Sequence, residues 1–254
     1  MSALLLVSSP GTVVVIGGLM GAAGALGLAM TGASRQWRSQ AGQRSLLGPL
    51  RSPELLSLMA VLTVCAVAGG VFNLALPAFA AGRGDPGAVG LLFAAWGVGG
   101  ALGGIWFGRR KPALPTEQLL SRGVAVFAVL TALPALAWDF WSMAVALLIG
   151  GTVIAPVTAV EYDLIGRAAP RGTLAEAFTW VMTANIAGGA LGSQLAGLQV
   201  HAHETRAAFL TAALVAGAGA VIAFTVRHRL AALPRAADDS PEQHADTAQA
   251  APAN

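Results

Sequence analysis

Apolar residues occupy seven long runs along the chain, and short polar segments separate them. The runs cover residues 13–30, 55–80, 87–108, 123–138, 140–160, 174–198 and 207–226. A helix crosses a bilayer with about 20 largely apolar residues, because each residue adds about 1.5 Å against a hydrocarbon core of about 30 Å. The pattern therefore predicts an all-α fold, a polytopic membrane helix bundle with seven transmembrane helices.

The fourth run is the shortest of the seven, because Arg122 and Asp139 bound it. An arginine near a helix end can extend its side chain to the membrane surface. The span can therefore lengthen past Arg122.

Composition indicates lipid surroundings. Of the 254 residues, 56% are hydrophobic, 11% are charged and 32 are glycine. Hydrocarbon offers the backbone no competing hydrogen bonds, so glycine-rich segments stay helical there, and small residues let helices approach closely. We expect a multi-pass protein of the cell membrane, with the lipid bilayer as its surroundings. The single cysteine, Cys65, excludes a disulfide within one chain.

Basic residues alternate between the connecting segments. Thirteen of the fifteen follow the first, third, fifth or seventh run, and the other connections hold only Arg83 and Arg206. Lys and Arg are retained on the cytoplasmic side of short loops. The pattern predicts an N-terminus outside the cell and a cytoplasmic C-terminus. Because the charges sit in short breaks, we expect no nucleic acid as a partner.

Residues with capping side chains mark several of the predicted helix starts. Ser52 and Asp85 each precede a proline, and Asp139 precedes the fifth run. Thr173 and Glu176 have the spacing of a capping box at the start of the sixth run.

Two prolines inside apolar runs predict helix kinks. Pro77 and Pro156 lack the N–H that would bond the carbonyls of Asn73 and Thr152, four residues earlier. Transporters place binding sites at such discontinuities, so Asn73 and Thr152 are candidates for a substrate path. The alternative is a kink that is simply packed within the bundle.

Polar side chains within the sixth run are the other candidates for a substrate path. Asn185 lies near the middle of this run, in helical register with Gly188 and Gly192. Gln194 lies nine residues later, about 180° around the helix, so the two side chains cannot line one path. The alternative role for Asn185 is a hydrogen bond between helices.

Glycines recur at a spacing of four, which puts them on one helix face and allows close contact with a neighbour. Such a face can be a static packing surface or a moving interface. The pairs are Gly17/Gly21, Gly99/Gly103, Gly100/Gly104, Gly104/Gly108 and Gly188/Gly192.

The third run begins near Gly90 and closes on Gly108, Arg109 and Arg110. In this pattern the run and the loop after it resemble the helix-loop motif of the major facilitator superfamily of secondary transporters. The fuller motif has an acidic residue where this chain has Ile105, so the match is degenerate. The residues that carry the resemblance are Gly90, Gly99, Gly103, Gly108, Arg109 and Arg110.

Two later segments extend the resemblance. Residues 148–170 are similar to the tenth helix of this superfamily and residues 172–197 to the eleventh. Residues 1–30 then resemble the sixth helix, 31–53 the cytoplasmic central loop and 54–230 the six-helix C-terminal half. The composition of residues 231–254 predicts a disordered cytoplasmic tail.

The resemblance implies a transporter that exports a small molecule, of unknown identity, by alternating access. It covers about half of a usual transporter, because five helices have no counterpart. The explanations are a misplaced start, a decayed gene, or a half-transporter that pairs with a second half or forms a homodimer. A seven-helix receptor or sensor is the alternative, although the only lysine, Lys111, lies in a loop and excludes a retinal Schiff base.

No catalytic constellation is present in the sequence, so we expect neither an enzyme nor a cofactor. His201 and His203 lack further ligands, and we expect no metal site. Glu161, Asp163 and Glu176 lie near the predicted cytoplasmic ends, where capping or pairing with Arg167 or Arg171 explains them. No acidic residue lies at a span centre, so this half gives no support for proton coupling.

Overall fold

The computed structural model describes residues 10–31, 48–110, 114–170, 172–201 and 205–233. The chain divides into two compact units, residues 1–43 and residues 44–254. The first unit contains α2 (Pro10–Met30), a helix of 21 residues where the sequence predicted one over 13–30.

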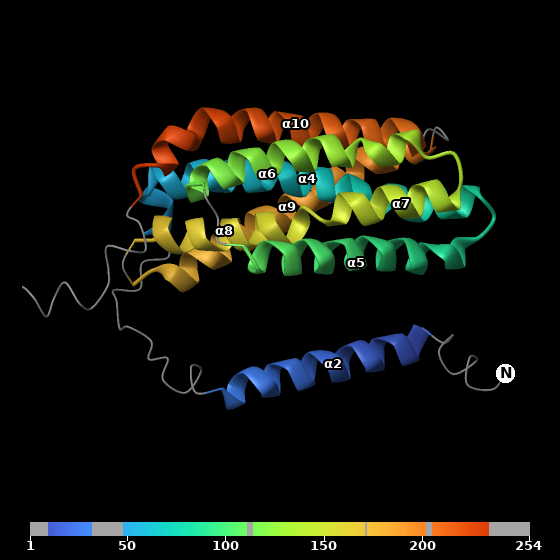
Figure 1. Ribbon diagram of the computed structural model, residues 1–254, viewed down its shortest axis with the longest axis horizontal. Helices are drawn as coiled ribbons and strands as arrows, with labels where there is room; N and C mark the ends of the chain where they lie inside the picture. Colours follow the sequence, from blue (N-terminus) through green and yellow to red (C-terminus); the bar gives the residue numbers. More distant parts are fainter. Residues whose placement is uncertain (1–9, 32–47, 111–113, 171, 202–204, 234–254) are drawn as a thin grey trace, which may run out of the picture. The chain divides into compact units, whose positions relative to one another are not determined.

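The second unit is a bundle of helices (Figure 1). Within the described ranges every regular element is helical, which confirms the all-α fold. The elements in chain order are η1 (Pro49–Arg51), α4 (Pro53–Gly82), η2 (Pro86–Ala88), α5 (Val89–Gly108), α6 (Thr116–Thr131), η3 (Leu133–Leu136), α7 (Phe140–Gly151), α8 (Ile154–Ala168), α9 (Leu174–His201) and α10 (Thr205–Leu230).

Five segments of the described chain are long and apolar enough to cross a membrane. They are Pro53–Gly82, Val89–Gly108, Thr116–Leu136, Phe140–Ala168 and Thr205–Leu230. The first, second and fifth are single helices, and the other two each join neighbouring elements. α9 is not among them, because its apolar sequence is interrupted by Asn, Ser and Gln residues. The seven-span count is thus supported for five spans, and the membrane orientation stays a prediction.

α4 is the central helix of the bundle. It packs most extensively against α9 and α10, while α10 also packs on α6, and α5 packs on α7. Buried side chains follow α4 along most of its length, from Leu55 and Leu58 near its start to Leu76. Phe72 stacks on Trp96 of α5 and meets Phe209 of α10 edge to face, with ring centroids 5.8 Å and 5.2 Å apart. α4 therefore fixes where its neighbours lie.

The fourth span departs from its predicted bounds. α6 begins at Thr116 rather than at 123, and its last turn leads into η3 near Pro134. Arg122 is exposed on the helix, so its charge does not end the span. Glu117 lies in the first turn, where a carboxylate is favourable to the helix dipole.

Three helix starts have the predicted caps. Ser52 accepts a hydrogen bond from the Leu55 amide at 3.2 Å at the start of α4. Asp139 accepts one from Ser142 at 2.8 Å, and the Ser142 hydroxyl accepts one from the Asp139 amide at 3.0 Å, which makes a capping box for α7. Asp85 caps η2 rather than α5 itself, because a short turn precedes that helix.

Several predictions lie outside the described residues. They concern nearly all of the tail 231–254, most of the linker 31–53, and Lys111, Arg171 and His203. The predicted division into four segments likewise stays a prediction.

Candidate transport path

The predicted kink at Pro156 coincides with a break in the helix. α7 ends at Gly151 and α8 begins at Ile154, so the two form one span interrupted at Thr152 (Figure 1). The Thr152 hydroxyl donates to the Ile149 carbonyl oxygen at 2.7 Å, within its own turn. The polar group of Thr152 left for another partner is its backbone carbonyl, for which Pro156 offers no N–H.

The motif glycines of α5 lie against this break. A Cβ added at Gly103 would overlap the carbonyl oxygen of Thr152, and one added at Gly99 would overlap that of Leu148. From the other side, a Cβ at Gly151 would overlap the carbonyl oxygen of Trp96. The two helices therefore meet backbone to backbone at Gly99 and Gly103.

The rest of the helix-loop motif lies at the ends of α5. Gly90 and Gly108 face open space. The Arg109 amide donates to the Ile105 carbonyl oxygen at 3.2 Å, and the Arg110 guanidinium lies 4.5 Å from the centre of the Trp106 ring. Both arginine side chains are exposed. This arrangement anchors the end of α5 through its charge and an aromatic ring.

The interface between α4 and α9 is also lined by glycine. A Cβ added at Gly192 would overlap the Val67 carbonyl oxygen, one at Gly188 would come 2.6 Å from the Thr63 carbonyl oxygen, and one at Gly70 would overlap the Gly189 carbonyl oxygen. Residue numbers rise together on both sides, so the two helices run in parallel.

Asn185 is half-buried, and its side-chain amide donates to the Val181 carbonyl oxygen at 3.1 Å. Both groups belong to α9. The hydrogen bond that the structure shows is therefore within one helix, rather than between helices as the packing interpretation expected.

Asn73 and Gln194 are exposed on the bundle and lie at similar depth. The Ser193 hydroxyl donates to the Gly70 carbonyl oxygen at 3.2 Å, and a Cβ at Gly197 would come 3.6 Å from Leu74. Asn73 lies between Gly70 and Leu74 on α4, and Gln194 lies between Ser193 and Gly197 on α9, so the two contacts enclose both amides along the helix axes. The structure thus brings these two candidates to one level, whereas Thr152 belongs to the interface with α5. α4 continues through Pro77.

Other polar contacts were missed by sequence reasoning. The Gln199 amide donates to the Thr211 hydroxyl at 2.7 Å, which joins α9 to α10, and its buried Oε1 accepts no hydrogen bond from the described chain. Both Ser193 and Gln199 are polar residues in an apolar setting, and that signal could have marked them. The spacing of residues gave no indication of which helix each would meet.

The acidic residues of α8 differ from one another. Asp163 forms an ion pair with Arg167 at 3.4 Å, as predicted, and Arg167 also donates to the Leu233 carbonyl oxygen at 3.3 Å. Glu161 is half-buried. Among the described residues no three His, Cys, Asp or Glu side chains lie close enough together to hold a metal ion.

The apolar spans and the close helix contacts define a multi-pass membrane protein. Residues 57–252 match the family described as the Major Facilitator Superfamily. The chain therefore belongs to this family, whose members are transporters and not enzymes. The receptor alternative is accordingly not retained. A comparison with curated proteins and with solved structures found no match.

Proposed function

We propose that the chain exports a small molecule across the cell membrane by alternating access, and that further helices, from a second half-transporter or a second copy, cover the exposed side chains of Asn73 and Gln194. The exposure of these two amides at one depth is the observation that supports the proposal.

An amide side chain in hydrocarbon is costly. Transfer of such a group from water without a hydrogen-bond partner costs roughly 2–7 kcal/mol. Thr179 and Thr183, which are also exposed on α9, avoid this cost because each hydroxyl donates to a carbonyl oxygen of its own helix at 2.8 Å. Asn73 and Gln194 instead require polar neighbours beyond the described bundle. A water-filled substrate path, or polar groups of a second set of helices, would supply them.

The broken span provides the second argument. Discontinuous helices supply both binding groups and places where the backbone can change its direction. The break at Thr152 lies within an apolar span and is covered by α5. In the proposed cycle, movement at this break would change how α5 packs over the Thr152 carbonyl.

Water access at the two amides can be tested without knowing the substrate. The native cysteine is first removed as Cys65→Ser. Asn73→Cys and Gln194→Cys are then made separately, and their reaction with a membrane-impermeant maleimide is measured in native membranes. Leu214→Cys is the matched control, because Leu214 of α10 is an apolar residue with 76% of its surface exposed.

Thiol alkylation proceeds through the thiolate, which forms in water and not in hydrocarbon. We therefore expect positions 73 and 194 to react at least about tenfold faster than position 214. Equal rates at all three positions would contradict a substrate path at Asn73 and Gln194. Protection of position 73 by crosslinking to a second copy would identify that copy as the cover.

The direction of transport needs a separate measurement. Cells that express the chain are loaded with ethidium, and the loss of dye is followed with and without Asn73→Ala. The proposal expects faster loss from cells with the wild-type chain and slower loss with the variant at equal membrane abundance. A chain that instead speeds ethidium entry would contradict efflux.

A further inference from the structure

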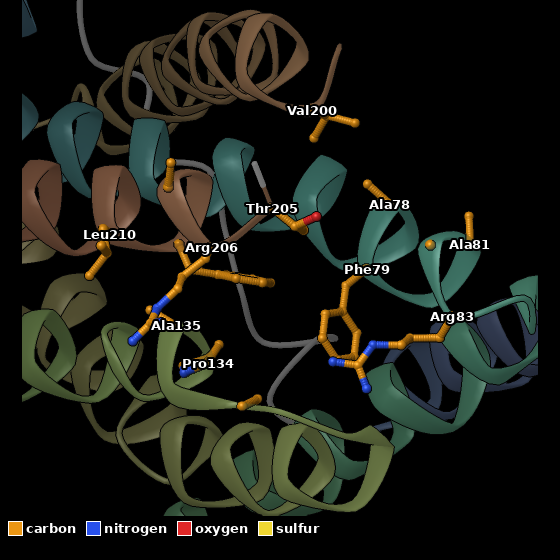
Figure 2. Close-up of a pocket in the computed structure, with 14 residues that line it drawn as sticks. Ala78, Phe79, Ala81, Arg83, Pro134, Ala135, Val200, Thr205, Arg206 and Leu210 are labelled. Atoms are coloured by element: carbon orange, nitrogen blue, oxygen red, sulfur yellow. The ribbon is translucent and has the colours of Figure 1, made fainter. Parts of the chain in front are cut away.

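A cavity of about 930 Å³ opens where α4 ends and α10 begins (Figure 2). Its walls come from four elements. The end of α4 contributes Phe79 and its C-cap Arg83, η3 contributes Pro134, α9 contributes Val200, and α10 contributes Thr205 and Arg206. This is the end of the bundle that the distribution of basic residues predicts to lie outside the cell.

The two arginines of this cavity have a notable place in the sequence. Arg83 and Arg206 are the only basic residues in the connections that otherwise lack positive charge. They are separated by more than a hundred positions, yet both line the same cavity. An arginine in such a connection opposes the charge pattern that orients the protein, so a local function would explain why both are present at this place.

Their side chains lie on opposite parts of the opening. The Arg83 guanidinium lies over the Phe79 ring, with its central carbon 4.8 Å from the ring centre. Stacking uses the face of the guanidinium and leaves the N–H groups at its edge available as donors. Arg206 extends from the first turn of α10 past Ala135 and Pro134 (Figure 2). Both side chains are exposed to a ligand that enters the cavity.

Two carboxylates near the cavity are engaged as helix caps. The Asp139 carboxylate, whose pKa is lowered by its hydrogen bonds with Ser142 and in part by the charge of Arg83, accepts the capping hydrogen bond from the Ser142 amide at 2.8 Å. The Asp85 carboxylate accepts a hydrogen bond from the Ala88 amide at 3.2 Å. In addition, α10 begins at Thr205, so the positive end of a 26-residue helix faces the same region. The N–H groups of Arg83 and Arg206 are therefore the donors that this cavity offers to an acidic group.

The remaining walls of the cavity are mostly apolar. They are formed by Phe79, Val200, Phe209 and Leu210. A bare inorganic ion would leave these surfaces without contacts. A ligand with both an acidic group and an apolar part would bury them and gain the hydrophobic contribution as well.

We propose that this cavity binds an amphiphilic anion, whose phosphate or carboxylate group accepts hydrogen bonds from Arg83 or Arg206 and whose apolar part lies against Phe79, Phe209 and Leu210. The source of the ligand is an anionic phospholipid of the surrounding membrane or a soluble amphiphilic acid. The site is separate from the proposed substrate path, so its test does not depend on the direction of transport.

Binding is measured by thermal unfolding of the purified full chain in dodecyl maltoside. A ligand that binds the folded state raises the unfolding temperature, and the rise grows with the logarithm of one plus the ratio of ligand concentration to dissociation constant. Four additives are compared at equal ionic strength: short-chain phosphatidylglycerol, phosphatidylcholine with the same chains, hexyl phosphate and inorganic phosphate.

The variant Arg83→Gln/Arg206→Gln removes both charges. Its matched control is Arg227→Gln, because the Arg227 guanidinium also lies over an aromatic ring, 5.7 Å from the centre of Phe224, but at the opposite end of α10. Arg83→Lys/Arg206→Lys keeps both charges and shows whether the double variant fails only through misfolding.

We expect stabilisation by phosphatidylglycerol, by hexyl phosphate or by both, and an apparent dissociation constant at least about tenfold higher in the double glutamine variant. The Arg227→Gln control should bind like the wild type, and the lysine variant should recover part of the affinity. A response to phosphatidylglycerol alone identifies a lipid site, and a response to hexyl phosphate alone identifies a soluble amphiphile.

Three results would overturn the proposal. Phosphatidylcholine could stabilise the chain as much as phosphatidylglycerol does. Arg227→Gln could weaken binding as much as the double variant does. Inorganic phosphate could act as strongly as hexyl phosphate, which would remove the role of the apolar walls.

Discussion

The interface of α4 with α9 and that of α5 with α7 and α8 both depend on glycine, but they pack different partners. At the first interface, Gly70 and Gly192 bring together two uninterrupted helices. At the second, Gly103 lies against Thr152, where the partner helix is broken. The comparison shows that glycine serves close approach in both places, but in one of them it also covers a carbonyl for which Pro156 offers no N–H.

This difference affects how each interface can respond to a change. Two continuous helices that meet backbone to backbone have no side chain that can move aside. A broken span has residues between its two segments that can absorb a change of φ and ψ. We therefore expect the interface between α4 and α9 to be the less tolerant of the two.

The largest expected effect is at Gly70. Gly70→Ala should lower the free energy of unfolding by about 2 kcal/mol or more, because the added methyl group overlaps backbone atoms of Gly189. Unfolding in mixed micelles with increasing SDS would measure it. The neighbouring Gly69→Ala is the control, since a Cβ there meets nothing within 4 Å, and it should stay within about 1 kcal/mol of the wild type. Equal losses in the two variants would refute the packing argument.

A smaller effect is expected at Gly103. Gly103→Ala should cost about 1–2 kcal/mol in the same assay, because the overlap with the Thr152 carbonyl oxygen can relax at the break between α7 and α8. Gly97→Ala, on a part of α5 where a Cβ meets nothing within 4 Å, is the control. A loss at Gly103 larger than that at Gly70 would reverse the proposed order of the two interfaces.

A third prediction tests whether the missing N–H of Pro156 causes the break between α7 and α8. Pro156→Ala supplies an N–H for the Thr152 carbonyl, so α7 and α8 should join and the free energy of unfolding should rise by about 1 kcal/mol. Hydrogen exchange should slow across residues 152–156. Pro77→Ala is the matched variant, because α4 already continues through Pro77, and exchange beyond position 77 should not change. Rapid exchange across 152–156 in the first variant would show that the proline does not cause the break.

The smallest effect concerns the caps at which the helices begin. Hydrogen bonds from Ser142 hold the pKa of Asp139 below its usual range, with Arg83 adding to the shift. Because the folded pKa is the lower one, the contribution is complete above the unfolded value of about 3.9 and is lost as the pH falls through the folded value. α4 begins instead with the neutral Ser52.

Unfolding temperatures between pH 6 and pH 3 would test this difference between the caps. Asp139→Asn should be less stable than the wild type at pH 6, and the two should converge as the pH approaches 3. Ser52→Ala should lower the unfolding temperature by a similar amount at every pH. A constant difference between the wild type and Asp139→Asn would contradict an ionised cap.

Several features of the site followed directly from local sequence. The cap at Asp139 and the break before Pro156 are each produced by residues within a few positions of one another. Local hydrogen bonds and a missing N–H act over one turn, so sequence alone is sufficient to predict them. α6 begins at Thr116, earlier than the apolar run at 123, so the span continues past Arg122, as the sequence allowed.

The candidate path was harder to predict, because it depends on how two helices pack against each other. Asn185 was the foremost polar residue by position, yet its amide bonds to Val181 of its own helix. The exposed amides of Asn73 and Gln194 lie on different helices, and their common level depends on contacts such as that of Ser193 with Gly70. No spacing within one segment indicates the register between two helices.

By itself, the sequence determined the all-α class, most of the helix bounds and the resemblance to a transporter family, because hydrocarbon makes a helix of nearly every long apolar run. Only the tertiary structure decided which glycines meet, which polar groups stay exposed and that Arg83 and Arg206 share a cavity. Those outcomes depend on the rotation and relative depth of packed helices. Many similar apolar surfaces compete for each contact, so the final arrangement is set by the packing of the whole bundle.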